Sequence, residues 1–340
     1  MNPRCIQLSE VIENPKMKTL NGVHHVTAIT SDAQRNVDFY AGLLGLRLVK
    51  KTVNFDDPQS YHLYYGDGRG TPGTILTFFV WPGAGRGRVG SGEPSRVAFE
   101  VPAGSLSQWR RRLSEAGLEV KENGAVFGGG TISFADPDGM QVELIESDTS
   151  RDVEIWRGGQ VGADAAIRII AGVTLTRPAR ASSDELYTKK LGFREVDAEG
   201  GRRRFVAGDG AAASFIDVVE PETAGHGRMG AGTIHHLAFR TPDDATQVEW
   251  LGKLTGLGLH VSPVMDRNYF HSIYFREPSG ILFEIATDGP GFAVDEAPEG
   301  LGESLKLPAQ YERARTQLEA ILPPIHLPER ATASNAEVRA

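Results

Sequence analysis

Short apolar and aromatic runs, separated by turn signals, predict strands joined by helices along most of the chain. The segments "YHLYYGD" (61–67) and "TILTFFVW" (74–81) flank the turn signal "GRGTPG" and predict two strands. After Asp32, which can cap a helix, apolar residues recur at helical spacing from Val37 to Leu44, and Gly45 follows as a stop. "LSQWRRRLSEAG" and "TQVEWLGKLTGLG" predict two further helices, each ended by glycine.

This pattern repeats within the chain. A shift of 147 positions places "VTAIT…FYAGLLGLRLV" on "VTLTR…LYTKKLGFREV", and a shift of 140 places "GRGRVGSG" on "GHGRMGAG". A shift of 141 places "DPDGMQVELIE" on "EPSGILFEIAT". The chain is therefore expected to hold two halves, 20–150 and 165–290, each with two βαβββ segments. Four such modules predict an α+β class rather than alternating parallel β/α units.

The two ends of the chain lie outside the repeats. Residues 1–19 are polar and aperiodic, and we expect a flexible leader that is dispensable up to Met17. Residues 291–340 are expected to form a C-terminal extension with one helix, Gln310–Leu322, and a disordered end.

Composition narrows the classes of partner. The net charge is −8, from 36 basic and 44 acidic side chains, and no basic block occurs, so nucleic acid and anionic membranes are not expected as partners. The apolar runs are too short to span a bilayer. A single cysteine, Cys5, excludes an intramolecular disulfide and fits a reducing cytoplasm. We expect a cytoplasmic protein with a small-molecule partner, and a homo-oligomer is compatible with the sequence.

Two adjacent histidine pairs begin two of the predicted strands, in "GVHHVTAIT" and "TIHHLAFRTP". In the repeat alignment, the equivalents of His24, His25, His235 and His236 are Ala171, Gly172, Ser95 and Arg96. Glu284 has an equivalent in Glu143. Only the first and fourth modules together therefore offer two histidines and a carboxylate, and we expect Glu143 to be structural or salt-bridged. Two imidazoles and one carboxylate on one face of an octahedral ion are the usual non-haem Fe(II) arrangement.

Over about residues 20–290, four βαβββ modules paired into two curved half-barrels resemble the vicinal oxygen chelate superfamily. Its members include glyoxalase I, bleomycin-binding proteins, fosfomycin-modifying thiol transferases and extradiol ring-cleaving dioxygenases. The superfamily motif is a ligand histidine directly before an apolar residue at the start of a module's first strand. This motif selects His25, before Val26, and His236, before Leu237. With Glu284 they are the metal ligands that the resemblance implies.

A narrower resemblance follows from the distribution of these ligands. Common two-domain extradiol dioxygenases take all three ligands from their second half, whereas here the first module supplies one. That arrangement is similar to the hydroquinone-cleaving ring dioxygenases, and the similarity extends through "RNYF.SIYFREP.G.LFEIATD.PGF" into the tail at "LGESLKLPAQYE". It implies Fe(II), with Mn(II) as the alternative ion, a hydroquinone-type or catecholic aromatic substrate, and O₂.

The same resemblance implies further residues near the metal. Arg267 and Tyr274 match groups that contact substrate or oxygen, and Thr27 matches a hydroxyl near the metal. Alternatively, Tyr274 is an aromatic on a half-buried strand, and Arg267 is a turn residue. Strand alternation sends His24 and His235 to the other face of the sheet, either as ordinary histidines or as hydrogen-bonding neighbours of the ligands.

Two other classes of function stay open. A glyoxalase-type isomerase with Zn²⁺ or Ni²⁺ needs a fourth ligand, and because residues 61–82 contain no glutamate, His62 would have to supply it. Otherwise we expect His62 and His271 to be structural. A non-catalytic binding protein of the bleomycin-resistance type needs no metal triad. The metal content of the purified protein would separate the three classes.

Overall fold

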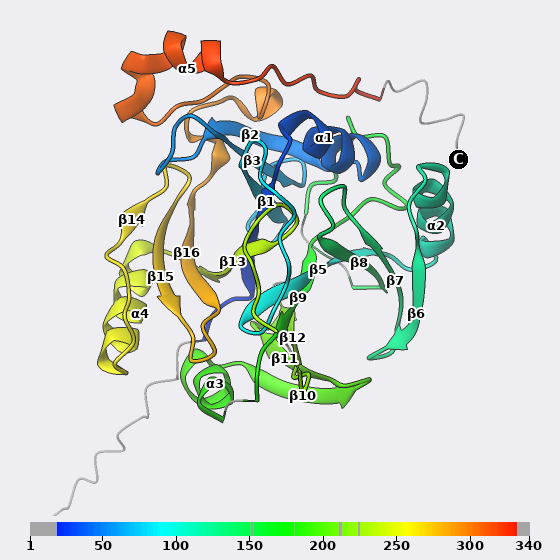
Figure 1. The fold of residues 1–340 in the computed structure, drawn as a ribbon, viewed down its shortest axis with the longest axis vertical. Helices are drawn as coiled ribbons and strands as arrows, with labels where there is room; N and C mark the ends of the chain where they lie inside the picture. Colours follow the sequence, from blue (N-terminus) through cyan, green and yellow to red (C-terminus); the bar gives the residue numbers. More distant parts are fainter. Residues whose placement is uncertain are drawn as a thin grey trace, which may run out of the picture.

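The computed structural model describes residues 19–149, 151, 153–179, 181–210, 213–223 and 225–331. They form two curved eight-stranded sheets with the helices at the periphery (Figure 1). The α+β architecture of four βαβββ modules is thus confirmed. The leader up to residue 18, with Cys5 and Met17, and the end of the extension beyond residue 331 lie outside the described residues.

Each sheet joins a module from one repeat half to a module from the other. The first sheet has the order β14-β15-β16-β13-β1-β4-β3-β2 and combines the first and fourth modules. Its strands are β1 Val23–Thr30, β2 Arg47–Val53, β3 Tyr61–Gly66, β4 Ile75–Val80, β13 Ile234–Thr241, β14 Met265–Asp266, β15 Phe270–Arg276 and β16 Leu282–Pro290. The two sheets therefore do not coincide with the two repeat halves.

The second sheet combines the second and third modules in the order β10-β11-β12-β9-β5-β8-β7-β6. Its strands are β5 Glu93–Pro102, β6 Lys121–Val126, β7 Gly129–Ala135, β8 Gln141–Ser147, β9 Ile170–Thr176, β10 Arg194–Glu199, β11 Arg202–Ala207 and β12 Ser214–Val219. The middle of each sheet is an antiparallel pair, β1 with β13 and β5 with β9. All eight residues of β1 are buried, as expected for a strand with neighbours on both sides.

The helices cover the outer faces of the modules. The Asp32 side chain accepts a hydrogen bond from the Arg35 N–H (2.9 Å) and caps α1 Ala33–Val37, which continues as a π-helical turn, Asp38–Leu43. The third module repeats this with α3 Ala181–Glu185 and the π-helical turn Leu186–Leu191. Two longer helices, α2 Leu106–Glu115 and α4 Asp244–Gly256, each bury one tryptophan and one leucine against their sheets.

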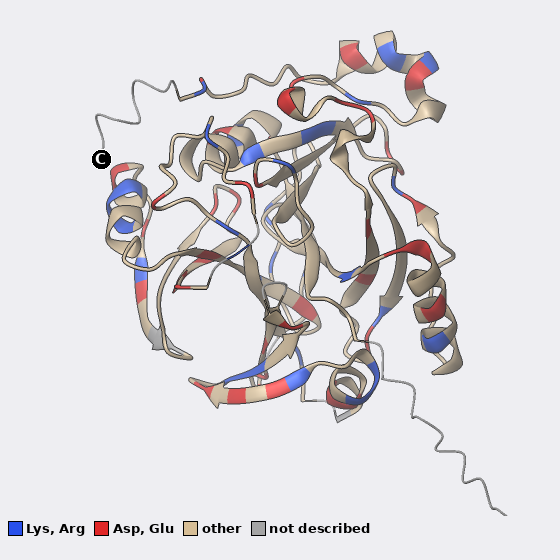
Figure 2. Cartoon of the chain, turned by 180° about the vertical axis from the view of Figure 1, so that it is seen from behind, with Lys and Arg blue, Asp and Glu red and all other residues tan. Residues whose placement is uncertain are grey.

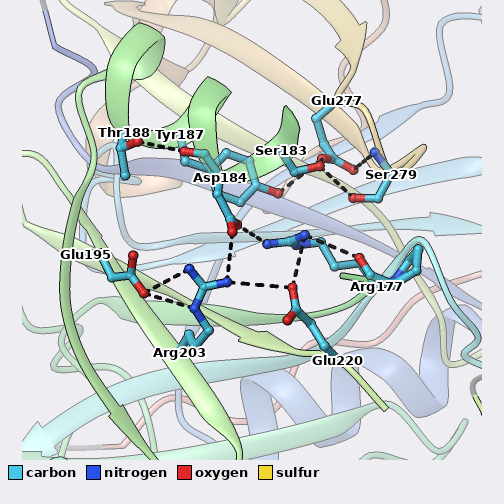
Figure 3. A network of polar contacts seen from close by, with 11 residues as sticks. Arg177, Ser183, Asp184, Tyr187, Thr188, Glu195, Arg203, Glu220, Glu277 and Ser279 are labelled. Carbon is cyan, nitrogen blue, oxygen red and sulfur yellow. Dashed lines mark hydrogen bonds and ion pairs between the residues drawn. The ribbon is translucent and has the colours of Figure 1, made fainter. Parts of the chain in front are cut away.

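Buried polar contacts tie the helix of one module to the turn of the next. Tyr187 donates to Glu277 Oε2 (3.3 Å), which also accepts from the Ser183 hydroxyl (2.7 Å) (Figure 3). The equivalent Tyr40 donates to Asp136 Oδ2 (3.0 Å) in the first half. Because the bond recurs at repeat-related positions, it belongs to the fold rather than to one site.

Acidic and basic residues are interspersed along the helices and strands. Figure 2 shows basic and acidic residues side by side on the peripheral helices, as on α2 and on α5 Arg315–Ile321. Among the described residues, no helix combines the length and apolarity needed to cross a membrane.

The C-terminal extension runs along β2, the edge strand of the first sheet. It contains three 3₁₀ segments before α5, namely η4 Phe292–Val294, η5 Pro298–Gly300 and η6 Ala309–Ala314. The helix expected over Gln310–Leu322 is found as η6 followed by α5, so the six residues of η6 are 3₁₀ and the α-helix begins at Arg315. The Lys306 N–H donates to the Lys51 carbonyl (2.9 Å), and the fully buried Lys50 ammonium lies 2.6 Å from carboxylate oxygens of both Asp295 and Glu296. The extension thereby covers an otherwise open sheet edge.

Candidate metal centre and its cavity

Three buried side chains converge from neighbouring strands of the first sheet. His25 lies on β1, His236 on β13 and Glu284 on β16. Glu284 Oε2 lies 3.3 Å from His25 Nε2 and 3.0 Å from His236 Nε2. One ligand atom from each residue lies within 4.8 Å of the other two, a spacing that can hold a metal ion. The structure thus brings together the three residues that the sequence resemblance implied.

Two β-bulges explain why His24 and His235 lie beside His25 and His236 and not on the opposite face of the sheet. The register between β1 and β13 shifts between Val23 and His25, so His24 is an extra residue on β1. It shifts again between Thr27 and Ala28, which makes His235 the extra residue on β13. A bulge breaks the alternation of side chains. The expectation that His24 and His235 point to the other face is therefore wrong: each ring contacts its neighbour, and His235 lines the same cavity as His236.

Each bulge histidine is hydrogen-bonded to the histidine beside the carboxylate. The Nδ1 atoms of His24 and His25 lie 2.8 Å apart, and those of His235 and His236 also lie 2.8 Å apart. Burial, with the neighbouring His25, holds the pKa of His24 well below its usual value, and burial lowers the pKa of His235 to about 3. Both bulge histidines are therefore neutral, and the Nδ1 of each can accept a hydrogen bond from Nδ1–H of its neighbour. That tautomer leaves the lone pairs of His25 and His236 at Nε2, on the side of Glu284.

Glu284 is fully buried, and its two oxygens have different surroundings. Oε1 accepts a short hydrogen bond from the Ser272 hydroxyl, whereas Oε2 forms no well-directed hydrogen bond with any described residue. Burial raises the pKa of Glu284, but His25 and His236 more than offset this, so its pKa lies well below the ordinary value. An ionised carboxylate oxygen that faces two imidazole nitrogens without a good donor is the setting that a divalent cation satisfies. The residues present therefore fit a metal ion.

A cavity of about 360 Å³ opens onto His25 and His236. Its wall is formed by His25, Thr27, Asn54, Phe55, Asp56, His62, Tyr64, Phe79, Trp81, His235, His236, Arg267, Phe270, Tyr274 and Leu282. This volume and the aromatic lining suit a small ring rather than an extended ligand. The C-terminal extension reaches the rim, because the Tyr311 hydroxyl donates to the Phe55 carbonyl (2.8 Å).

Tyr274 and Arg267 lie together on the cavity wall. Tyr274 is the cross-strand partner of Glu284, which places both on one face of the sheet. Arg267 Nε donates to the Tyr274 hydroxyl (3.1 Å), and its Nη1 lies 3.6 Å from Asp56 at the rim. Burial raises the pKa of Tyr274 despite the nearby guanidinium, so its hydroxyl keeps its proton at neutral pH.

The structure also places His62 and His271, which were expected to be structural unless His62 supplied a fourth metal ligand. His62 lines the cavity, and its Nε2 and Nδ1 lie 2.6 Å from Thr77 Oγ1 and 2.9 Å from the Tyr64 hydroxyl. The sequence indicated His62 only as a conditional fourth ligand and not its bond to Thr77, which lies on another strand. His271, by contrast, is half-buried beside Asp244, with 2.6 Å between Nδ1 and Oδ1, and it does not line this cavity.

The equivalent position in the second sheet is closed by ion pairs. Glu143 is paired with Arg96, the counterpart of His236, and with Arg202 (2.9 Å). At the counterpart of His25, any side chain on Gly172 would overlap Phe215. The prediction that Glu143 is salt-bridged is confirmed, and one of its partners, Arg96, occupies the sequence position of His236.

Residues 22–144 and 170–285 match the model of the Glyoxalase/Bleomycin resistance protein/Dioxygenase superfamily, and these two ranges are the two repeat halves. The chain belongs to this superfamily. A solved structure from Bacillus subtilis subsp. subtilis str. 168, whose name is that of a dioxygenase, superimposes on this chain with a TM-score of 0.88 and 44% identity, covering 92% of this chain and 99% of that one.

Two curated relatives cover almost the whole chain. MhqO of Bacillus subtilis (strain 168), which bears the name of a ring-cleaving dioxygenase, is 45% identical over 92% of this chain and 99% of its own length. The chlorohydroquinone/hydroquinone 1,2-dioxygenase of Sphingobium indicum is 37% identical over 88% of this chain and 95% of its own. Both of these relatives are thus named as dioxygenases.

Proposed function

We propose that this protein is an Fe(II)-dependent dioxygenase that cleaves a hydroquinone-type aromatic ring and inserts both atoms of O₂. The observation that carries the proposal is the buried group of His25, His236 and Glu284 at the end of a small, aromatic-lined cavity. The names of the relatives support the same reaction class. Catechols are the second choice of substrate.

The metal would be held by His25 Nε2, His236 Nε2 and Glu284. Fe(II) held by these residues would supply open coordination sites and the redox chemistry that a reaction of an aromatic hydroxyl compound with O₂ requires. Mn(II) accepts the same nitrogen and oxygen donors and is the alternative ion. Cleavage of one ring carbon–carbon bond, with its σ and π electron pairs, supplies the four electrons that reduce both atoms of O₂ as the O–O bond breaks, so no external reductant is required.

The protein's own side chains would orient the ring and handle its protons. Tyr274, paired across the strands with Glu284, can hydrogen-bond an oxygen that lies beside the triad. Arg267 donates to the Tyr274 hydroxyl (3.1 Å), and its positive charge would stabilise negative charge that develops on the substrate ring. His24 and His235 would hold the tautomer and ring orientation of the two ligand histidines.

The site favours this proposal over a glyoxalase-type isomerase. In the described part of the chain, the metal-ligand group at this site contains three residues, not four. Both nitrogens of His62, the candidate fourth ligand, are already engaged by Thr77 and Tyr64. A three-residue set leaves more positions open for a substrate and O₂ than a four-residue set does.

Oxygen uptake tests the proposal. The protein is purified anaerobically, loaded with Fe(II), and mixed with methylhydroquinone, chlorohydroquinone or catechol in air-saturated buffer. We expect uptake with a hydroquinone that is lost in a zinc-loaded sample and in His236→Ala. Uptake with catechol and none with any hydroquinone would move the protein to the ordinary extradiol class. No uptake with either, in iron-replete protein, would refute the proposal.

A further inference from the structure

A short rim segment, residues 54–57, lies between the metal cavity and the C-terminal extension. It follows β2 directly, and its first three residues belong to the cavity wall. Backbone hydrogen bonds close its base, from the Asn54 N–H to the Ser60 carbonyl (2.9 Å) and from the Ser60 N–H to the Asp57 carbonyl (3.2 Å). The contacts at the tip of this loop therefore decide the shape of the cavity mouth.

Phe55, at the tip, joins the packing of the cavity to the extension. Its ring packs against the small apolar cluster that contains Phe270 and Phe292. The centre of the Phe270 ring lies 5.0 Å from that of His25, so this cluster reaches a proposed metal ligand. The Phe55 carbonyl accepts a hydrogen bond from the hydroxyl of Tyr311 (2.8 Å), a residue 256 positions further along the chain.

Tyr311 is held in place on both sides along the extension. It lies in η6, and its partly buried ring packs against the main hydrophobic core. Leu307 before it and Leu318 after it are both buried. The Arg315 guanidinium, at the end of η6, donates to the Leu305 carbonyl (3.1 Å). The Tyr311 hydroxyl therefore has a fixed position relative to the first sheet.

The other side-chain contact at the tip of the rim segment is weaker. Asp56 lies 3.6 Å from Arg267, but its side chain is 73% exposed, and an exposed ion pair of this length contributes little. The bond from Tyr311 to Phe55 is shorter and partly buried, and one such hydrogen bond typically changes an equilibrium by about two- to tenfold. The position of the rim segment therefore depends chiefly on Tyr311.

We propose that Tyr311 is a positioning residue that determines the size of the ring the cavity admits: its hydroxyl holds Phe55 at the cavity mouth, which excludes rings with a bulky substituent. This inference rests on the proposed function and adds a determinant of substrate size that lies outside the two sheets. Tyr311 is not part of the cavity wall, so it acts through Phe55.

Hydrogen–deuterium exchange tests the positioning of the rim segment without any ligand. Tyr311→Phe keeps the ring that packs on the core and removes the hydroxyl. We expect the amides of residues 54–57 to exchange about three- to tenfold faster in this variant, and peptides from β16 to be unchanged. Unchanged exchange in residues 54–57 would refute the inference.

Tyr61→Phe is the matched control. The Tyr61 hydroxyl also joins the first sheet to the extension, since it donates to the Pro323 carbonyl (2.9 Å), but Tyr61 is not part of the cavity wall. We expect wild-type exchange in residues 54–57. Faster exchange there in Tyr61→Phe, equal to that in Tyr311→Phe, would show a general loosening of the extension and would contradict a specific role of Tyr311.

The size of the admitted ring is measured with zinc-loaded protein, in which no turnover occurs. Methylhydroquinone and tert-butylhydroquinone are titrated anaerobically by calorimetry, and their dissociation constants are compared. We expect the wild type to prefer the methyl compound, and Tyr311→Phe to lower this preference by about threefold or more. Tyr61→Phe should keep the wild-type preference.

Phe55→Ala shows whether the effect passes through Phe55. This variant should itself lower the preference, and adding Tyr311→Phe should change it by less than about twofold, because the side chain that the hydroxyl positions is gone. A wild-type preference in Tyr311→Phe, or an undiminished further loss in the double variant, would overturn the inference. Failure of the proposed function would look different, since the zinc protein would then bind neither ring, and the exchange of residues 54–57 would still decide whether Tyr311 positions the rim segment.

Discussion

Replacing Ser272 by alanine tests whether the protein prepares Glu284 as a metal ligand. Ser272 lies two residues before Tyr274 on β15, and its hydroxyl donates to Glu284 Oε1. Glu284 is 0% exposed, so water cannot replace the lost donor without a rearrangement. The variant should keep all three ligands but hold the carboxylate less firmly.

The expected magnitude follows from this single contact. A hydrogen bond to a charged group contributes about 1.5–3 kcal/mol, and 1.4 kcal/mol corresponds to about tenfold in an equilibrium constant. Loss of an outer-shell partner typically lowers metal affinity by about 10–100-fold. We therefore expect Ser272→Ala to weaken metal affinity by about 10–100-fold while the fold is retained.

Competition with a chromophoric chelator, under anaerobic conditions, measures this affinity. The repeat offers a matched control: Thr131 occupies the equivalent position on β7, where its hydroxyl donates to the Gly129 carbonyl (3.3 Å). Thr131→Ala should bind metal like the wild type. An affinity for Ser272→Ala within twofold of the wild type, with the fold intact, would refute the reasoning that this hydroxyl prepares the ligand.

Three further predictions concern the ligands, the cavity wall and the C-terminal extension. Alanine at His25, His236 or Glu284 should abolish iron retention, as measured by metal analysis. Glu143→Ala should keep its iron but lose about 3 kcal/mol of stability in chemical denaturation, because Arg96 and Arg202 lose their shared partner. Iron loss in Glu143→Ala with iron kept in Glu284→Ala would contradict the assignment. Tyr274→Phe should lower kcat by about 10²-fold at near-normal iron content, and an unchanged kcat would remove Tyr274 from the reaction. Gly302→Ala should destabilise the protein by more than about 2 kcal/mol, because φ is +79° and a Cβ would overlap the Leu48 carbonyl. Gly300→Ala is the control, since a Cβ there has open space. Equal melting temperatures of the two variants would contradict this packing.

Much of the architecture was predictable from the sequence because repeats and apolar periods report local structure. The internal repeats indicated four modules, and the loss of histidines in the second and third modules indicated which pair of modules holds His25, His236 and Glu284. Glu143 was predictable for the same reason, since arginine falls where a ligand histidine would be.

The remaining features depend on register and on contacts between distant segments. The bulges at His24 and His235 come from one-residue shifts in the pairing of β1 with β13, and strand alternation within either segment cannot reveal such a shift. His62 reaches the cavity through its bond to Thr77 on another strand. The path of the extension along β2 likewise depends on the tertiary contacts of Lys50 and Lys51, which no local period encodes.

Isotope labelling of the product tests the central claim most directly. Iron-loaded protein is given a hydroquinone under ¹⁸O₂ in ordinary water, and the product is analysed by mass spectrometry at early times, before carboxylate oxygens exchange with solvent. The account predicts a ring-opened product that carries two ¹⁸O atoms per molecule and is absent from Glu284→Ala. A product with an intact ring, or one without ¹⁸O, would contradict the claim that this protein is a ring-cleaving dioxygenase.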